Sequence, residues 1–260
     1  MSFQLPTSLN VLLLGDGCID VYHYGRCDRI SPEAPVPVFL EEETETRMGM
    51  ALNVYLNLVA FDLSVECMVG ETYIEKHRYI DSRSKQHLLR VDRNESEQSG
   101  IFRFDSRILG DVDLVIISDY EKGFLPSSEA KRLCDYCYTE NIPVFVDSKK
   151  TDLSCFENCI IKINKNEYDK ITNYPTKYDL IVTLGADGAL YKGEIYETKQ
   201  VEVFDVCGAG DVFMASLVYM YLRHGDIIKS IKFANKCAAY SVTKFGTYVL
   251  TEEDINDLRV

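Results

Sequence analysis

The chain has 260 residues, of which 46% are hydrophobic, and this is enough for one large α/β domain with a substantial core. A formal net charge of −13 argues against nucleic acids and anionic membranes as main partners. No apolar run reaches the roughly 18 residues of a spanning helix, and residues 1–10 carry no signal-peptide pattern, so we expect a cytoplasmic protein.

The first predicted element is a buried parallel strand over residues 11–14, where an apolar run ends in Gly15-Asp16. Asp20 follows just beyond it, where open parallel sheets bind ligands. A helix is predicted over residues 51–61, reached through Gly49, and it carries Asn53 near its start. Taken alone, Asn53 is equally compatible with a polar helix-start residue that has no further role.

Between these two elements lies an aromatic, proline-spaced stretch over residues 22–39. It cannot be helical at Pro32, Pro35 and Pro37, which predicts extended strands that leave the main body as a lid. Isolated strands of this kind need a partner to cover them, so we expect a homodimer through the lid.

From residue 111 onward, a regular alternation of strands and helices predicts a parallel sheet with right-handed crossovers. A helix is predicted to begin at Ser127 or Ser128, both good N-caps. Strands are predicted at residues 112–117, 142–146, 159–163 and 179–184. Each strand ends in polar or glycine residues, at the edge where a doubly wound sheet keeps its site.

The nine cysteines, an odd number without a secretion signal, are expected to be free thiols. One grouping, Cys134 and Cys137 followed by Cys155 and Cys159, comes close to a four-cysteine zinc spacing. However, Cys134 and Cys137 continue a helical stripe begun by Leu133, at the spacing that faces a core. We therefore expect core cysteines, with structural zinc as the alternative.

Residues 205–222 combine a glycine turn with an apolar helix. Gly208 and Gly210 permit a tight turn and a close approach of backbone N–H groups to a ligand. The run over residues 212–222 is almost entirely apolar, which predicts a buried helix whose N-terminus attracts anions, phosphate above all. Asp211 at this start is either a helix cap or a general base for a substrate hydroxyl.

Residues 205–211 read Asp-Val-Cys-Gly-Ala-Gly-Asp and resemble the Asp-Thr-x-Gly-Ala-Gly-Asp signature of the ribokinase-like (PfkB) sugar kinases. The resemblance implies that Asp211 is the catalytic base. It also implies that the backbone of Gly208, Ala209 and Gly210 forms an anion hole. The valine in second place departs from the usual threonine, but it removes neither the turn nor the base.

Further stretches are similar to the heptose 7-phosphate kinases, a branch of this family. They are Gly15-Asp16-x3-Asp20, the run Arg-Ile-Ser-Pro-Glu-Ala-Pro-Val-Pro-Val at residues 29–38, Gly49-x3-Asn53, and residues 84–92 and 118–123. The resemblance implies that Asp20, Gly49 and Asn53 bind the sugar. It makes Arg29, Arg90 and Lys122 candidates for gripping the 7-phosphate, an anion that needs cations in an acidic protein.

The chain departs from this branch in two places. Between Gly70 and Tyr79 it is shorter than its relatives by roughly a helix and a strand. Met50 stands where the relatives have glycine, and its side chain adds bulk where backbone would approach the sugar. A reshaped pocket for another sugar is therefore an alternative.

The same resemblance implies a nucleotide site at the strand ends. Asn164-x2-Glu167 corresponds to the motif associated with nucleotide phosphates and Mg²⁺, and Thr183, Gly185 and Gly188 correspond to the nucleotide loop. The implied nucleotide-binding residues are Lys149, Asn164, Lys165, Asn166, Glu167, Thr183, Gly185, Gly188 and Asn235, with Glu167 acting on Mg²⁺ directly or indirectly. Asp205 and Thr247 are candidates for a monovalent cation, K⁺. The alternatives are an ordinary helix cap for Asn164 and Glu167, a hairpin turn for the loop from Thr183 to Gly188, a solvated side chain for Lys149 and an asparagine without a role for Asn235.

We therefore predict one ribokinase-like α/β domain over residues 1–260, with a central, mostly parallel sheet flanked by helices. A small β lid is predicted from strands near residues 18–40 and 84–105. ATP with Mg²⁺ would phosphorylate the C1 hydroxyl of a heptose 7-phosphate, giving the 1,7-bisphosphate, as in ADP-heptose synthesis for the lipopolysaccharide core. The alternatives are a kinase of another sugar or sugar phosphate, or a non-catalytic sugar- or nucleotide-binding homologue.

Overall fold

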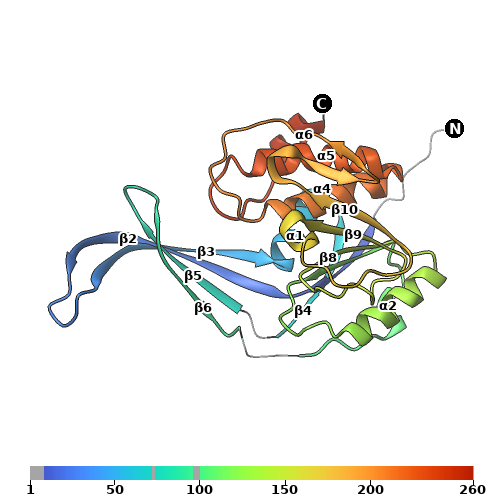
Figure 1. Ribbon diagram of the computed structural model, residues 1–260, viewed down its shortest axis with the longest axis horizontal. Helices are drawn as coiled ribbons and strands as arrows, with labels where there is room; N and C mark the ends of the chain where they lie inside the picture. Colours follow the sequence, from blue (N-terminus) through green and yellow to red (C-terminus); the bar gives the residue numbers. More distant parts are fainter. Residues whose placement is uncertain (1–8, 72–73, 96–99, 260) are drawn as a thin grey trace.

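A computed structural model describes residues 9–71, 74–95 and 100–259 of the chain. Within these ranges the chain forms a central sheet with helices on both faces and a second sheet that projects away from one side (Figure 1). None of the helices in these ranges is long and apolar enough to cross a membrane.

The central sheet has eight strands in the order β12-β11-β10-β9-β8-β7-β1-β4. Strands β4, β1, β7, β8, β9 and β10 run parallel to one another. β11 and β12 form an antiparallel hairpin at one edge, where β11 pairs antiparallel with β10. Their bounds are β1 Asn10–Gly15, β4 Ser64–Val69, β7 Leu114–Asp119, β8 Val144–Ser148, β9 Cys159–Asn164, β10 Tyr178–Thr183, β11 Ala189–Tyr191 and β12 Glu194–Tyr196. The predicted parallel sheet is confirmed, because each predicted strand is present.

Alternate side chains of the central strands enter two separate cores. On β1, Val11 and Leu13 pack in the core shared with α1, α4, α5 and α6, whereas Leu12 and Leu14 pack in the core shared with α2. The helices are α1 Ala51–Ala60, α2 Ser127–Thr139, α3 Lys165–Tyr168, α4 Ala209–His224, α5 Ile227–Ser241 and α6 Glu252–Arg259. Two short 3₁₀ helices, η1 Ser106–Leu109 and η2 Gly185–Asp187, complete the body. The strands are thus buried on both faces, as their continuous apolar runs predict.

The cysteines of the possible zinc grouping lie in the α2 core. Cys134 and Cys137 are buried on the inner face of α2, as the helical stripe predicts. Cys155 and Cys159 are buried in the same apolar cluster, and the sulfur atoms of Cys134 and Cys159 are 3.4 Å apart. All nine cysteines are free thiols. Apolar neighbours account for these positions without a metal.

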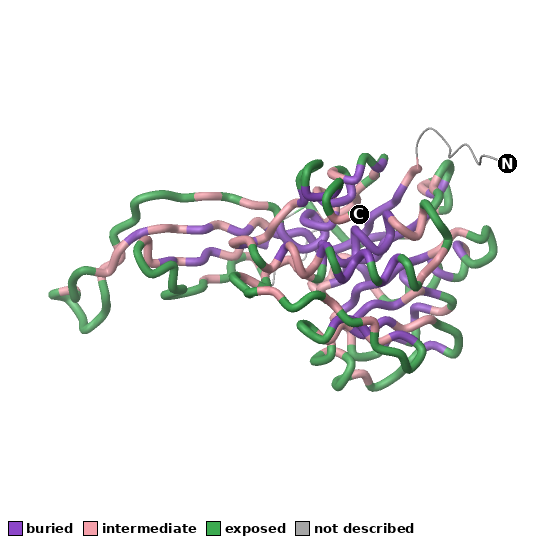
Figure 2. Tube along the Cα trace, turned by 90° about the horizontal axis from the view of Figure 1, so that it is seen from above, coloured by how far each residue is buried: buried purple, intermediate pink, exposed green. Residues whose placement is uncertain are grey.

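The second sheet, which we call the lid, has four strands in the order β3-β2-β5-β6. Their bounds are β2 Gly17–Ile30, β3 Pro37–Met50, β5 Ile74–Asp81 and β6 His87–Arg93. The extended lid predicted over residues 22–39 is confirmed. Pro37 begins the edge strand β3, a position where a missing N–H group is tolerated. Figure 2 shows that burial fades toward the outer end of the lid.

The predicted bounds of the lid are wrong in three respects. β3 continues to Met50 instead of stopping near residue 40, and the sequence pattern does not predict β5. β6 ends at Arg93, and the described residues 100–105 lie outside both sheets, so the strand expected to continue to residue 105 does not. The sequence does not predict β5 because the chain is shorter than its relatives between Gly70 and Tyr79, whereas β5 begins at Ile74, inside that range.

Candidate active site

The N-terminus of α4 is built around a glycine that no other residue could replace without strain. Gly208 is the N-cap residue, with φ of 76° in the left-handed region. A Cβ atom there would lie 2.6 Å from Nδ2 of Asn53. The N–H groups of Asp211 and Val212 both donate to the carbonyl oxygen of Gly208, at 3.0 Å. The predicted glycine turn and buried helix are confirmed.

The carboxylate of Asp211 does not cap this helix; it is held by side chains from two other elements. Its Oδ2 accepts a hydrogen bond from Nδ2 of Asn53 on α1, and its Oδ1 accepts one from the hydroxyl of Tyr120 after β7, both at 2.9 Å. Asp211 is only 4% exposed. Three distant parts of the chain therefore fix one carboxylate at the start of α4.

The electrostatic surroundings make Asp211 a suitable base near neutral pH. Burial raises its pKa to about 6; the hydrogen bond from Asn53 opposes this rise, the charge of Asp147 adds to it, and Lys162 opposes it. A carboxylate with this pKa is ionised at pH 7 and accepts a proton more readily than an ordinary aspartate.

Two ion pairs lie at the carboxyl ends of β8 and β9, next to this turn. The ammonium group of Lys162, which is 3% exposed, binds the Asp147 carboxylate and donates to the carbonyl oxygen of Gly210 at 3.3 Å. Lys149 binds Glu167; burial would lower the pKa of Lys149, but the carboxylates of Asp147 and Glu167 raise it. The sequence gives no reason to single out Lys162, because a lysine in an apolar strand run has no partner that can be read from the sequence.

Asn164 and Glu167 form the capping box of the short helix α3. The Asn164 side chain accepts from the N–H of Glu167 at 2.9 Å, and Glu167 accepts from the N–H of Asn164 at 2.8 Å. The interpretation of this motif as a helix cap is therefore confirmed, and Glu167 also forms an ion pair with Lys149. Lys165 and Asn166 are exposed on α3.

A cavity of about 250 Å³ extends from the first turn of α4 toward β10 and α5. Five of the predicted nucleotide-binding residues line it, namely Asn164, Thr183, Gly185, Gly188 and Asn235. Ala209 and Gly210 line its inner end. The remaining four, Lys149, Lys165, Asn166 and Glu167, are not among its lining residues. The cavity thus connects the predicted nucleotide loop with the glycine turn.

On the lid side, Asp20 is buried in an ion pair that the sequence does not predict. Its Oδ1 binds Nη1 of Arg78 on β5 at 2.5 Å, and both side chains are under 10% exposed. Gly49 on β3 passes so closely that a Cβ atom there would collide with the Asp20 carboxylate and lie 2.6 Å from the sulfur of Cys18. Gly49 is therefore needed for packing at this point.

Arg78 lies among other cations. It faces Arg90 of β6 across the lid sheet, and Arg90 binds both carboxylate oxygens of Asp92 at 2.6 Å. The ammonium group of Lys76 is 5.8 Å from the centre of the Tyr120 ring. Lys122 pairs with Glu95 at 3.0 Å. The lid therefore brings three cationic side chains, two of them paired with carboxylates, to the side of the site where Lys76 approaches Tyr120.

Arg29, which the resemblance places at the substrate phosphate, is far from this cluster within one chain. It is exposed near the outer end of β2, where it pairs in register with Val38 (Figure 1). From Asp20 to Arg29, at about 3.3 Å per residue, the strand covers roughly 30 Å. Within one chain an extended strand therefore separates Arg29 from Asp20, and a contact of Arg29 with the sugar phosphate stays a prediction that would need a second copy of the lid.

Met50, at the junction of β3 and α1, has a φ of 56° and a ψ of −134°. A side chain at such a backbone conformation costs on the order of 1–3 kcal/mol. The residue is buried against Cys18 and Ile74, and Tyr120 packs on the same cluster. Its bulk therefore lies beside the residue that holds Asp211.

Asp205 and Thr247, the candidate cation ligands, lie together but have other partners. The two oxygens of Asp205 accept the N–H groups of Cys207 at 3.0 Å and Gly246 at 2.9 Å. Arg47 of the lid donates to the backbone carbonyl of Thr247 at 3.3 Å. The Thr247 hydroxyl is buried without a hydrogen-bond partner in the part of the chain that the structure describes.

A family model described as pfkB family carbohydrate kinase matches residues 83–254, well over half of the chain. The chain belongs to the pfkB family of carbohydrate kinases. Membership of this family indicates an ATP-dependent sugar kinase.

Solved structures share the fold of this pfkB kinase. Ribokinase from Arabidopsis thaliana, complexed with ribose and ATP, has a TM-score of 0.68 at 16% identity and covers 96% of this chain and 98% of its own. Phosphofructokinase-2 from Escherichia coli, in complex with potassium, has a TM-score of 0.72 at 14% identity, with 96% and 97% covered. The predicted ribokinase-like fold is confirmed.

Curated relatives of the pfkB kinase include the bifunctional protein HldE of a Nitratiruptor species, 32% identical over 299 residues and 95% of this chain. The bifunctional protein HldE of Campylobacter curvus is 30% identical over 98% of this chain. The chain spans 64% and 66% of the length of these two proteins. The alignment with the Nitratiruptor protein extends over 299 positions, more than the 260 residues of this chain. Within the aligned region that relative therefore contains residues that this chain lacks.

Proposed function

We propose that this kinase transfers the γ-phosphoryl group of ATP to the C1 hydroxyl of a heptose 7-phosphate and that Asp211 deprotonates this hydroxyl. The supporting observation is the position of Asp211, held by Asn53 and Tyr120 at the start of α4 with a pKa of about 6. A base in this position would act on a hydroxyl that approaches from the lid. This arrangement disfavours a non-catalytic binding protein, which has no need of a buried carboxylate with a raised pKa.

The glycine turn would stabilise the transferred group. The N-terminus of α4 carries the positive end of a helix of sixteen residues, and the backbone of Gly208, Ala209 and Gly210 forms its first turn. The nucleotide would occupy the cavity between this turn and Asn235, with Thr183, Gly185 and Gly188 beside it. Phosphoryl transfer depends on such positioning and on charge neutralisation more than on covalent chemistry.

Asp147 is the carboxylate beside this turn that would contact Mg²⁺. The described residues contain no cluster of three or more acidic, histidine or cysteine side chains that could hold an ion by themselves, so the nucleotide phosphates would supply further ligands. One oxygen of Asp147 is buried without a hydrogen-bond partner among the described residues, and carboxylate oxygens are the ligands that Mg²⁺ prefers. Glu167 already accepts from Lys149 and from the N–H of Asn164, so its role toward the ion would be indirect. When bound, Mg²⁺ would neutralise charge on the nucleotide phosphates. Lys149 would add a second positive charge.

The phosphate of the sugar would be bound by lid cations. Arg78 has five N–H donors, and its buried position next to Asp20 directs it toward the sugar side of the site. Arg90 lies opposite Arg78 on β6, Lys76 lies two residues before Arg78 on β5 and approaches Tyr120, and Lys122 follows Tyr120 by two residues. Asp20 and Asn53 would bind sugar hydroxyls. This proposal keeps Arg90 and Lys122 and replaces Arg29 by Arg78. The names of the HldE relatives are compatible with a heptose phosphate substrate.

The deciding experiment measures ADP release from ATP with a panel of sugars and sugar phosphates, including a heptose with and without its 7-phosphate. We expect kcat/KM to be highest for the 7-phosphate. Arg90→Met should raise KM for the sugar phosphate by roughly 10- to 150-fold and leave KM for ATP unchanged, because a charge-assisted contact contributes about 1.5–3 kcal/mol. Arg90 is the better choice because Arg78→Met would also leave Asp20 buried without its cation. Arg107→Met is the control, because Arg107 is exposed on the body and pairs with Asp105, and it should leave both constants unchanged. Equal turnover of the unphosphorylated sugar would refute the phosphate contact.

A kinase of another sugar is the second candidate, and Met50 favours it. Its side chain is buried in the cluster on which Tyr120 packs, so its bulk would reduce the room for a sugar beside Tyr120. If Met50 excludes the heptose, the same panel would show turnover of a smaller sugar or sugar phosphate, and Met50→Gly would restore activity toward the heptose 7-phosphate.

We also propose a homodimer formed through the lid, in a cytoplasmic enzyme. The lid exposes large apolar side chains of three strands and one loop, namely Ile30, Val36, Leu40, Leu88 and Leu89. Such surfaces on a projecting sheet are usually covered in solution. Light scattering at micromolar concentration tests this proposal, and a monomer would contradict it.

A further inference from the structure

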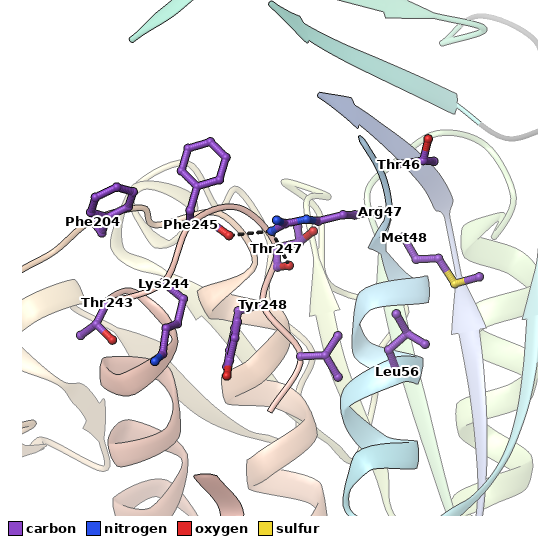
Figure 3. A pocket seen from close by; sticks show the side chains of 11 residues that line it. Thr46, Arg47, Met48, Leu56, Phe204, Thr243, Lys244, Phe245, Thr247 and Tyr248 are labelled. Carbon is purple, nitrogen blue, oxygen red and sulfur yellow. Dashed lines mark hydrogen bonds between the residues drawn. The ribbon is translucent and has the colours of Figure 1, made fainter. Parts of the chain in front are cut away.

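Arg47, on the lid strand β3, reaches across to the loop of residues 243–249 (Figure 3). Its Nη1 donates to the carbonyl oxygens of Phe245 at 2.6 Å and Thr247 at 3.3 Å. Its Nε and Nη2 bind the two carboxylate oxygens of Glu45 at 2.7 and 3.1 Å. Arg47 is thus a fixed positive charge that faces two backbone carbonyls.

The same loop is joined to the catalytic turn. Asp205 accepts one N–H from Cys207, just before the turn, and another from Gly246 in the loop. A Cβ atom on Gly208 would lie 3.4 Å from the Cα atom of Thr247, so the loop and the turn are in close contact. Residues 245–247 therefore contact Arg47 on one side and the start of α4 on the other.

A K⁺ ion does not fit these residues. A monovalent cation replaces its hydration shell with a set of oxygen atoms. Here the carbonyls of Phe245 and Thr247 accept from a guanidinium group, and both oxygens of Asp205 accept backbone N–H groups. Of the groups just named, the Thr247 hydroxyl alone has no partner among the described residues.

We propose that Arg47 takes the role of a monovalent cation in this kinase. Its guanidinium donates to the carbonyl oxygens of Phe245 and Thr247 and holds this loop against the catalytic turn, so that activity does not depend on added K⁺. Arginine keeps its charge at every working pH. Gly246 makes room for it, because a Cβ atom there would collide with Nη1 of Arg47 and lie 3.2 Å from the hydroxyl of Tyr22. A side chain of the lid, Arg47, thus supplies the positive charge that a dissolved cation would otherwise supply.

The first test compares wild-type rates in KCl, NaCl and tetramethylammonium chloride at equal ionic strength. We expect rates that agree within about twofold, because screening is then the same in all three salts. The second test uses Arg47→Met, which keeps the length of the side chain and removes its charge. Its rate in tetramethylammonium chloride should fall by roughly 10- to 150-fold, the loss expected for a charged hydrogen-bond donor. KCl should recover part of this loss.

A thermal readout makes the test independent of the sugar. The unfolding temperature of Arg47→Met should rise with KCl concentration relative to tetramethylammonium chloride, while that of the wild type should not. Arg26→Met is the matched control, because Arg26 on β2 also pairs with a glutamate of β3, Glu42, but makes no contact with the loop in the described structure. A wild-type rate that rises several-fold with K⁺ overturns the proposal. A folded Arg47→Met variant with the wild-type rate also overturns it, and if that variant does not fold, the wild-type comparison decides.

Discussion

Replacing Asp211 by asparagine should separate the catalytic role of this residue from its effect on stability. Asparagine has the same shape and can keep both hydrogen bonds: its oxygen can accept from Asn53, and its amide group can donate to the hydroxyl oxygen of Tyr120. The fold should therefore persist. Without a base, turnover should fall by roughly 10²- to 10⁴-fold.

The same substitution should stabilise the protein at alkaline pH. The fold raises the pKa of Asp211 from 3.8 to about 6, a shift of about 2 units, or about 3 kcal/mol. Between these two values the folded chain holds a proton that the unfolded chain has released, so this residue's contribution to stability falls as the pH rises. Above pH 6 the full penalty of the buried charge applies, and asparagine avoids it. The variant should thus gain up to about 3 kcal/mol at pH 8, and this gain should shrink below pH 6.

Denaturant unfolding at pH 8 and pH 5, together with ADP release at pH 8, measures both effects. Near-normal turnover would show that Asp211 is not the base. A variant that is less stable than the wild type at pH 8 would show that the two hydrogen bonds do not survive the exchange, and the electrostatic reasoning would fail with them.

Three further predictions concern the surroundings of this residue and the lid. Tyr120→Phe removes a donor that lowers the pKa of Asp211, so the acidic limb of the pH–rate profile should shift to higher pH; an unchanged profile would contradict the contact. Lys162→Met leaves the buried Asp147 with only the more distant Lys149, at 3.8 Å, and should cost up to about 3–5 kcal/mol in unfolding free energy; adding Asp147→Asn should restore most of this loss. Leu89→Glu, on the exposed face of β6, should turn a lid-mediated dimer into a monomer in light scattering, while the unfolding temperature stays within a few degrees.

The sequence predicts the strands and helices of the central sheet well, because each of them is encoded by a short continuous stretch of residues. Each parallel strand is a short apolar run that ends in polar or glycine residues, and Gly208 shows its need for a left-handed conformation through its place in the turn. The identity of Asp211 as a candidate base follows from the same seven residues. What these residues do not contain are its two partners, because Asn53 and Tyr120 come from other elements.

Sequence reasoning is least informative where the role of a residue depends on which distant parts of the chain lie next to it in the fold. Arg29 lies in the segment that most resembles the heptose kinases, but an extended strand carries it away from Asp20. Arg78, which does meet Asp20, is on a strand that the sequence pattern does not predict. Arg47 carries no sequence signal, because its partners are backbone carbonyls some two hundred positions away. Contacts of this kind become visible only when the lid and the body are placed together.

The short connections between the body and the lid restrict how the lid can move. Asp16 alone separates β1 from β2, and α1 begins directly after β3. Asp16 also binds the N–H groups of Tyr120 and Lys122, and its carbonyl accepts the N–H of Ala51 at the start of α1. Opening would therefore be a rotation of a stiff flap about one hinge line, not the folding of a loop. Such a rotation would carry Asp20 and Arg78 together and would strain the attachment of Tyr120, so that access of substrate and alignment of the base are mechanically coupled.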